Sequence, residues 1–217
     1  MLDAQLARRG IRDPRVLDAF RRVDRAAFVT SDLVGSAYAD SPLPIGEGQT
    51  ISQPYIVALM AETLELEGHE RVLEVGTGSG YAAAILSRLA GEVFTIERVP
   101  TLAEVSRARL IRLGHSNTHV RLGDGTQGWP EHAPFDAITV AACGAVVPEA
   151  LLAQLAVGGR LVIPTGDVAS IQVLKRFTRV SANDVREESL LDVRFVPLIA
   201  GEPRRESAPW STPPSHS

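Results

Sequence analysis

The chain has 217 residues, of which 45% are hydrophobic and 22% charged, with a formal net charge of -4 and a single cysteine. These values exclude a disordered chain and a disulfide framework, and the net negative charge disfavours binding to a phosphate backbone. The length is typical of one globular domain with small additions.

The N-terminal quarter of the chain is predicted to be a helical region followed by a long loop. Residues 1–30 are expected to be helical, and residues 31–54 contain three glycines and three prolines. A connection this long in a compact domain is usually functional, commonly a lid or a substrate loop. A further helix is expected over Tyr55–Leu64.

No targeting or membrane segment is evident in the sequence. The N-terminus lacks a basic stretch followed by an apolar one, and no apolar run reaches the roughly 18 residues that a spanning helix needs. We therefore expect a cytoplasmic protein without a membrane partner.

Short apolar runs alternate with helical segments from residue 71 to 165. Strands are expected at 71–75, 93–97, 119–122, 136–140 and 159–164, and helices at 81–90, from Pro100 to Gly114 and from Pro148. This alternation predicts right-handed crossovers and a doubly wound α/β fold whose parallel sheet is covered on both faces. Two more strands, at 171–178 and 190–198 around a polar turn at 181–184, predict an antiparallel pair at one edge.

A glycine turn after the first strand of this sheet indicates a ligand site. Residues 74–81 read EVGTGSGY, and Gly76, Gly78 and Gly80 permit positive φ and a close approach of backbone N–H groups to a ligand. A dinucleotide-binding turn would have its third glycine where this chain has Tyr81. The departure favours a nucleoside without a pyrophosphate, although the turn alone is also compatible with a structural role.

Carboxylates stand at the ends of the next two strands. Glu97 ends the second strand, where its carboxylate can accept hydrogen bonds from both hydroxyls of a ribose. Asp124, between Gly123 and Gly125, follows the third strand and suits the amino group of an adenine. A strand-end acid by itself is as well explained by solvation. The three strand ends together indicate S-adenosylmethionine.

The sequence lacks the motifs of three other kinds of site: a serine nucleophile, a phosphate-binding loop and a metal centre. Ser79 is not a nucleophile elbow because position 77 is threonine, and the only lysine, Lys175, is followed by Arg176 instead of opening a phosphate loop. His115 and His119 are four residues apart but lie in a predicted loop, so we expect no metal site.

The most specific segment of the chain is 37–54, AYADSPLPIGEGQTISQP, and further short motifs occur at 72–81, 96–98, 123–125, 128–130, 134–136, 158–164 and 193–198. In these segments the chain resembles the protein-L-isoaspartate (D-aspartate) O-methyltransferase family, over roughly residues 4–198. Segment 37–54 is similar to the family's substrate loop. The resemblance implies a Rossmann-like, S-adenosylmethionine-dependent methyltransferase fold with a mostly parallel sheet, an antiparallel edge and an N-terminal helical extension.

The activity that this resemblance implies is protein repair. A methyl group passes from S-adenosylmethionine to the α-carboxyl of an L-isoaspartyl residue, and the ester closes to a succinimide whose hydrolysis regenerates some normal aspartyl. The implied partners are isoaspartyl-containing proteins and peptides, with no nucleic acid, and we expect a monomer.

The family's active-site serine corresponds to Ser52. An isoaspartyl carboxylate is ionised well below pH 7 and needs no general base, so we assign Ser52 the role of a donor that orients this anion. The bare sequence also allows Ser52 to be the N-cap of the following helix. The implied cofactor contacts are Thr50, Ile51, Glu74, Gly76, Thr77, Gly78, Ser79, Gly80, Glu97, Arg98, Asp124 and Gly125.

The resemblance also defines the expected organisation of the chain. One domain is expected over residues 1–200, with an N-terminal helical and substrate-loop region (1–54), a cofactor-binding core (71–165) and edge strands (166–200). Residues 201–217 are rich in proline and serine and predict a disordered tail.

Two alternatives remain. Another S-adenosylmethionine-dependent methyltransferase, acting on a small molecule or nucleic acid, would share residues 76–125 but would not explain the 37–54 segment. A degenerate, non-enzymatic module would show damage to the glycine turn, Glu97 or Ser52, and all are intact.

The chain departs from the family pattern at Ala141, Cys143 and Ile199. At Ala141 and Ile199 the family often has threonine, so a side-chain hydroxyl is lost at both positions. The segment around Val196–Leu198 is expected near the bound peptide, and Cys143 is expected to be a small buried residue.

Overall fold

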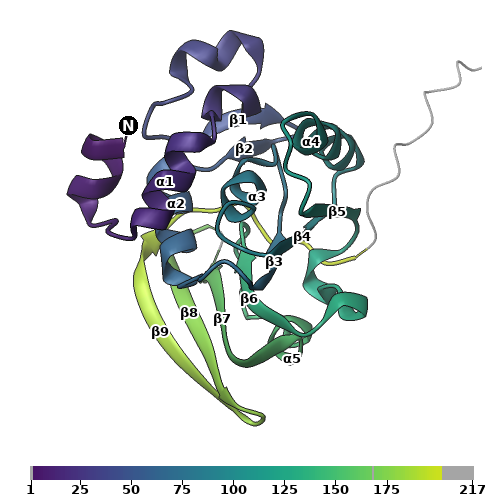
Figure 1. Ribbon diagram of the computed structural model, residues 1–217. Helices are drawn as coiled ribbons and strands as arrows, with labels where there is room; N and C mark the ends of the chain where they lie inside the picture. The colour runs from purple at the N-terminus through teal and green to yellow at the C-terminus, as the bar shows by residue number, and fades with distance from the viewer. Residues whose placement is uncertain (1, 168, 202–217) are drawn as a thin grey trace, which may run out of the picture.

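A seven-stranded sheet with the order β5-β4-β3-β6-β7-β8-β9 forms the centre of the protein (Figure 1). The computed structural model describes residues 2–167 and 169–201, so the predicted tail lies outside the described residues except for Gly201. The strands are β3 Arg71–Val75, β4 Glu92–Glu97, β5 Thr118–Leu122, β6 Phe135–Val140, β7 Leu155–Thr165, β8 Gln172–Ser181 and β9 Asp184–Val193. Strands β3 to β7 pair in parallel and β7, β8 and β9 pair antiparallel, which confirms the predicted fold class.

Helices cover both faces of the sheet. The helices are α1 Pro14–Arg22, α2 Pro54–Thr63, α3 Tyr81–Leu86, α4 Pro100–Arg112 and α5 Glu149–Ala153. Alternate residues of β3 enter two apolar cores: Val72 packs with the core of α1, α2 and α3, while Leu73 and Val75 pack with the core that includes Leu151 of α5. In the described part of the chain, no helix is long and apolar enough to cross a membrane.

The N-terminal region is helical, as predicted, but in short pieces. A turn of π-helix at Leu2–Leu6 and 3-10 turns at Ala7–Arg9, Arg25–Phe28 and Ser31–Ser36 accompany α1. The segment predicted to be a loop contains a hairpin of β1 Leu43–Gly46 and β2 Gln49–Ile51. Its two-residue turn has positive φ at Glu47 and Gly48, as hairpin turns of the primed type require. The hairpin was not predicted because Glu-Gly is a weaker turn signal than Asn-Gly or Asp-Gly.

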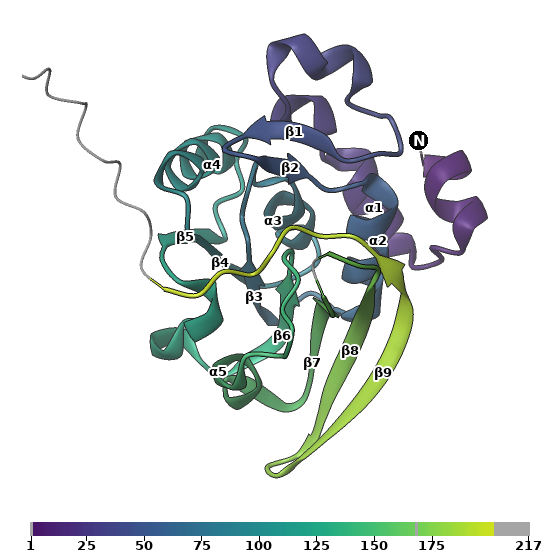
Figure 2. The ribbon, with the colours of Figure 1, turned by 180° about the vertical axis from the view of Figure 1, so that it is seen from behind.

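The strand predicted at 190–198 is wrong in its bounds. A turn is confirmed at residues 182–183, inside the predicted 181–184, but β9 already starts at Asp184 and ends at Val193. The first six residues of this edge strand are exposed, so its sequence lacks the alternation of apolar and polar residues from which a strand is predicted. Residues 194–201 instead cross the carboxyl ends of the sheet, as the yellow trace in Figure 2 shows.

Candidate functional site

A cavity of about 750 Å³ opens at the carboxyl ends of β3, β4 and β6. It lies where the strand order reverses between β3 and β6, the usual ligand position in such sheets, and its volume suits a small molecule. Ten of the predicted site residues line it: Thr50, Ile51, Ser52, Gly76, Thr77, Gly78, Ser79, Glu97, Arg98 and Gly125. Glu74, Gly80 and Asp124 are not among its lining residues.

The glycine turn forms one wall through its backbone shape. Gly76, Gly78 and Gly80 all have positive φ (96°, 51° and 87°). Side chains would find little room there, because a Cβ on Gly78 would lie 3.3 Å from Ile45 Cδ1. Four N–H groups of the turn bond within the protein: Gly76 and Thr77 to Ile96 O (2.8 and 3.3 Å), Gly78 to Glu97 Oε2 (2.8 Å), and Gly80 to Thr77 O (2.8 Å). Because these four N–H groups already have partners in the protein, the main contribution of the turn to a ligand is a wall without bulky side chains.

Gly80 and Tyr81 follow this wall at the start of α3, and of the two only Tyr81 lines the cavity. A Cβ on Gly80 would lie 3.3 Å from Leu110 Cγ, so glycine at this position allows α3 to pack against α4. Tyr81 is 1% exposed, and its ring meets the edges of Phe20 and Phe28 at centroid distances of 6.0 and 5.5 Å. Tyr81, which stands where a dinucleotide-binding turn has its third glycine, therefore packs the N-terminal region against the helix that follows the glycine turn.

Glu97 holds its carboxylate at the second strand end. Its Oε2 accepts from Gly78 N–H at 2.8 Å, and its Oε1 accepts from Val99 N–H, just before α4, at 2.9 Å. The positive end of α4 favours a negative charge at this place. Because a carboxylate has about four acceptor positions, these two bonds leave two positions that hydroxyl groups of a ligand can use. Arg98, the next residue, also lines the cavity.

Glu74 lies beneath the turn, inside the sheet. Its side chain is 1% exposed, and its Oε2 accepts from Thr95 Oγ1 at 2.5 Å, while Thr95 Oγ1 and Thr77 Oγ1 lie 2.6 Å apart. Burial raises the pKa of Glu74 to about 8, the nearby Glu97 carboxylate adds to the rise, and the bond from Thr95 acts against it. Glu74 is therefore mainly protonated at neutral pH and reaches the cavity wall only through Thr95 and Thr77.

Asp124 and Gly125 stand at the third strand end. Gly125 lines the cavity, and a Cβ there would lie 2.3 Å from Val75 Cγ1, so only glycine fits. Asp124 accepts from Thr126 N–H at 2.9 Å and from Gly201 N–H at 2.7 Å. Although burial acts to raise it, these bonds hold the pKa of Asp124 below its usual value. In this structure its carboxylate orders the turn and anchors the crossing segment.

Ser52 lines the cavity between β2 and α2 and is half-buried. The helix begins at Pro54, and its N-cap position is occupied by Gln53, which makes no side-chain capping bond. The interpretation of Ser52 as an N-cap is therefore wrong. Gln53 instead donates from Nε2 to Asp40 O at 3.1 Å, tying the start of α2 to the segment before β1.

The segment 194–199 forms the wall that the strand prediction missed. It is fixed to the end of β6 by Cys143 N–H to Val196 O (2.8 Å) and Leu198 N–H to Cys143 O (2.7 Å). Buried Gln172, at the start of β8, holds it by bonds to the N–H and carbonyl of Phe195 (2.7 and 3.1 Å). Glutamine within a predicted strand carried no signal for such a role.

The three departures from the family pattern lie in or near this region. Ala141 lines the cavity, and its Cβ would be 3.4 Å from a Cβ at Gly76. Ile199 also lines the cavity and is 45% exposed. Cys143 is 1% exposed, as expected of a small buried residue, and burial raises the pKa of its thiol.

Comparisons with known proteins agree with one another. The family model described as Protein-L-isoaspartate(D-aspartate) O-methyltransferase (PCMT) matches residues 1–203. Protein-L-isoaspartate O-methyltransferase 1 of Rhodopseudomonas palustris (strain HaA2) is 58% identical over 209 residues, covering 96% of this chain and 85% of that protein. Protein-L-isoaspartate O-methyltransferase of Anaeromyxobacter dehalogenans (strain 2CP-1) is 60% identical over 198 residues, covering 91% and 95%.

Solved structures give the same result at lower identity. A putative protein-L-isoaspartate O-methyltransferase from Plasmodium falciparum, in complex with S-adenosyl-L-homocysteine, superposes with a TM-score of 0.79 at 30% identity and covers 91% of this chain and 96% of its own. A second protein-L-isoaspartate O-methyltransferase has a TM-score of 0.84 at 31% identity, covering 94% of this chain and 67% of its own.

Proposed function

The chain belongs to the protein-L-isoaspartate(D-aspartate) O-methyltransferase family, and from this premise we propose that it methylates the α-carboxyl of L-isoaspartyl residues in damaged proteins and peptides. S-adenosylmethionine is the methyl donor, in keeping with the S-adenosylhomocysteine bound by the Plasmodium falciparum protein. One observation supports the proposal: a single cavity is lined both by the glycine turn with Glu97 and by Ser52 from the 37–54 segment.

The residues present fit this cofactor. The wall of Gly76 and Gly78 leaves space that a Cβ on either residue would narrow. We propose that the Glu97 carboxylate, fixed by two N–H groups, binds the ribose, and that Gly125, which also lines the cavity, borders the bound nucleoside. We propose that Thr50, Ile51, Thr77, Ser79 and Arg98 complete the cofactor site.

The task of the protein is to bring an anion and a methyl group together. When bound, S-adenosylmethionine supplies a methyl group activated by a sulfonium. The isoaspartyl carboxylate is ionised at neutral pH, so the chain need not remove a proton. Holding two reactants in line inside a cavity can lower a reaction barrier by an amount on the order of 7–11 kcal/mol.

We assign Ser52 the role of orienting the isoaspartyl carboxylate for the reaction. Its hydroxyl can donate one hydrogen bond to an oxygen of the anion, and a bond to a charged acceptor is stronger than one between neutral groups. The other carboxylate oxygen then attacks the methyl carbon, the C–O bond forms, and the bond from carbon to sulfur breaks. In the released methyl ester the following backbone nitrogen attacks the ester carbonyl and methanol leaves, which gives a succinimide without the enzyme. Hydrolysis of the succinimide regenerates some normal aspartyl.

A methyl-transfer assay with paired peptides tests this function. Two peptides of identical composition, one with L-isoaspartate and one with normal aspartate, are incubated with the enzyme and radiolabelled S-adenosylmethionine. We expect label in the isoaspartyl peptide alone. Equal labelling of both, or transfer only to a small-molecule acceptor, would contradict the proposal and favour a different methyltransferase.

We also propose that the enzyme is a monomer in the cytoplasm, built as one domain over residues 1–200. Light scattering coupled to size exclusion tests the oligomeric state, cell fractionation tests the location, and limited proteolysis tests the domain bounds.

A further inference from the structure

Arg25 is a completely buried arginine at the base of the 37–54 segment. It opens the 3-10 turn Arg25–Phe28, after the N-cap Asp24, and none of its surface is exposed. Arginine is almost never fully buried in proteins unless it is paired. Its contacts therefore show what holds this charge in place.

The partners of the Arg25 guanidinium are backbone carbonyls. Its Nη1 donates to Ala37 O and, at 3.4 Å, to Ala39 O, and its Nη2 donates to Ser41 O at 3.3 Å and to Ser52 O at 2.9 Å. Among the residues that the structure describes, no carboxylate forms an ion pair with Arg25, and its Nε has no partner. The guanidinium is thus stabilised by neutral dipoles of one segment.

These carbonyls come from both sides of the β1–β2 hairpin. Ala37, Ala39 and Ser41 precede β1, while Ser52 directly follows β2. The planar, forked guanidinium can bridge the two sides in a fixed geometry, which a flexible ammonium cannot do. Nη2 itself is shared between Ser41 O and Ser52 O, so it joins the backbone of the serine to the opposite side of the segment.

Arg25 also contacts the cofactor side of the cavity. Its Cζ lies 5.7 Å from the centroid of the Tyr81 ring, within cation–π range. Tyr81 starts α3 directly after the glycine turn and lines the cavity. One side chain therefore links the backbone at Ser52 with the helix that follows the turn.

We propose that Arg25 is a positioning residue for the methyl transfer: by holding the carbonyl of Ser52 to the segment before β1, it sets the Ser52 hydroxyl at the distance from the glycine turn that the reaction needs. This inference rests on the proposed function and on the role assigned to Ser52. Arg25 touches neither reactant and acts only through the backbone of the serine.

The test is a double-mutant cycle of Arg25→Lys and Ser52→Ala. Lysine keeps the charge but cannot bridge both sides of the hairpin, so we expect kcat with the isoaspartyl peptide to fall about tenfold. In the Ser52→Ala background, the same change should lower kcat less than about twofold, because no hydroxyl remains to be positioned. Calorimetry should show S-adenosylhomocysteine binding within about twofold of wild type in both backgrounds.

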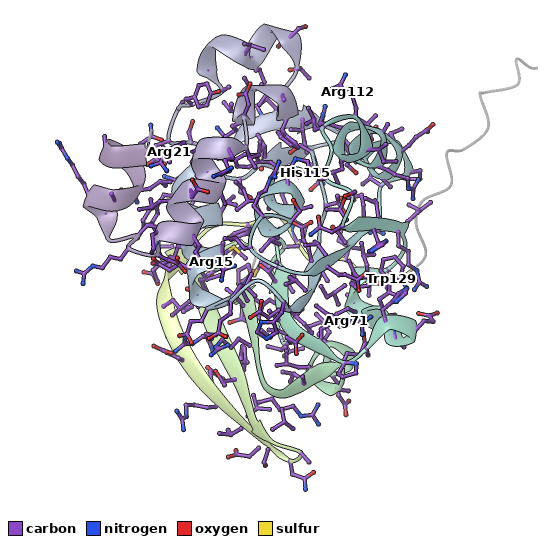
Figure 3. The ribbon with its side chains drawn as sticks, in the orientation of Figure 1. Arg15, Arg21, Arg71, Arg112, His115 and Trp129 are labelled. Atoms are coloured by element: carbon purple, nitrogen blue, oxygen red, sulfur yellow. The ribbon has the colours of Figure 1, made fainter. Side chains whose placement is uncertain are left out.

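Arg15→Lys is the matched control. Arg15, labelled in Figure 3, also bridges backbone carbonyls of two segments, Leu66 O at 2.6 Å and Leu89 O at 3.1 Å. Its partners are far from Ser52 in sequence and do not line the cavity. Arg15→Lys should lower the melting temperature by an amount similar to Arg25→Lys and leave kcat nearly unchanged. Hydrogen exchange of the amides at 49–53 should rise in Arg25→Lys alone.

Three results would overturn the proposal. One is an equal loss of kcat from Arg25→Lys with and without the Ser52 hydroxyl. Another is a kcat for Arg25→Lys that matches the Arg15→Lys control. The third is loss of the folded state in both Arg25→Lys and Arg25→Gln, which would assign Arg25 to the fold. Failure of the proposed function is distinguishable from these results, since the wild-type enzyme would then leave the isoaspartyl peptide unlabelled.

Discussion

The two sides of the cavity are built in different ways. On the cofactor side, the glycine turn and Glu97 follow directly from two neighbouring parallel strands, and the bonds that fix them run between those strand ends. On the side of Ser52, the segment 37–54 has only a short hairpin of its own, and its shape depends on a residue of the preceding helical region, Arg25. The sheet thus fixes one wall locally, while the other wall needs a long-range contact.

This difference implies that changes on the two sides will have separable effects. Damage to the strand ends should weaken binding of the cofactor, because the proposed cofactor contacts lie on that side. Damage to the hairpin side should slow the reaction with little loss of cofactor binding.

Ser52→Ala should have the largest effect. Loss of a hydrogen bond to a charged group costs about 1.5–3 kcal/mol, so we expect kcat to fall roughly 10- to 100-fold. S-adenosylhomocysteine affinity, measured by calorimetry, should stay close to the wild-type value. Ser36→Ala, at an exposed position of a 3-10 turn outside the cavity, is the control and should be silent. Equal losses of turnover and cofactor affinity would remove Ser52 from the role assigned to it.

Glu97→Gln should have the opposite signature. The amide leaves one acceptor oxygen where the carboxylate had two, and its NH2 group would face a backbone N–H, so the side chain can no longer serve Gly78, Val99 and a ribose together. We expect the Kd of S-adenosylhomocysteine to rise about tenfold. Glu92→Gln, at the exposed start of the same strand, should leave that Kd unchanged. If Glu97→Gln binds as tightly as wild type, the ribose contact is elsewhere.

Glu74 gives a pH prediction on the cofactor side. In the folded protein its pKa is about 8, whereas an exposed glutamate ionises near a pH of about 4.3. Between these values the folded state binds more protons than the unfolded state, so this group's contribution to stability falls as pH rises, by up to about 1.4 kcal/mol per pH unit. Urea unfolding of Glu74→Gln, which retains an acceptor for Thr95, should show a flatter decline between pH 5 and 8. An unchanged pH slope would mean that Glu74 ionises normally.

Ile199→Thr should have the smallest effect. Ile199 is half-exposed on the crossing segment, so replacement by the family's frequent threonine removes little buried apolar surface. We expect the KM of isoaspartyl peptides to change less than about threefold, with cofactor affinity unchanged. Ile111→Thr, on the exposed face of α4, is the control. A change above tenfold would make Ile199 a specificity residue.

The same contrast explains what could be predicted from the sequence. Strands such as 71–75 and the glycine turn were found because apolar runs and glycines report local backbone requirements. The course of 194–201 and the role of Gln172 were missed, since their bonds join residues distant in sequence. Arg25 gave no signal either, because an arginine among interspersed charges is typical of a solvated helix face.

The most direct test of the central claim is the position of the methyl group in the product. A peptide carrying one L-isoaspartyl residue, one normal aspartyl residue and a free C-terminus is methylated briefly at mildly acidic pH, and the ester is located by tandem mass spectrometry. We expect the methyl group on the α-carboxyl of the isoaspartyl residue alone. Methylation of the normal aspartyl side chain or of the C-terminus to the same extent would contradict the account.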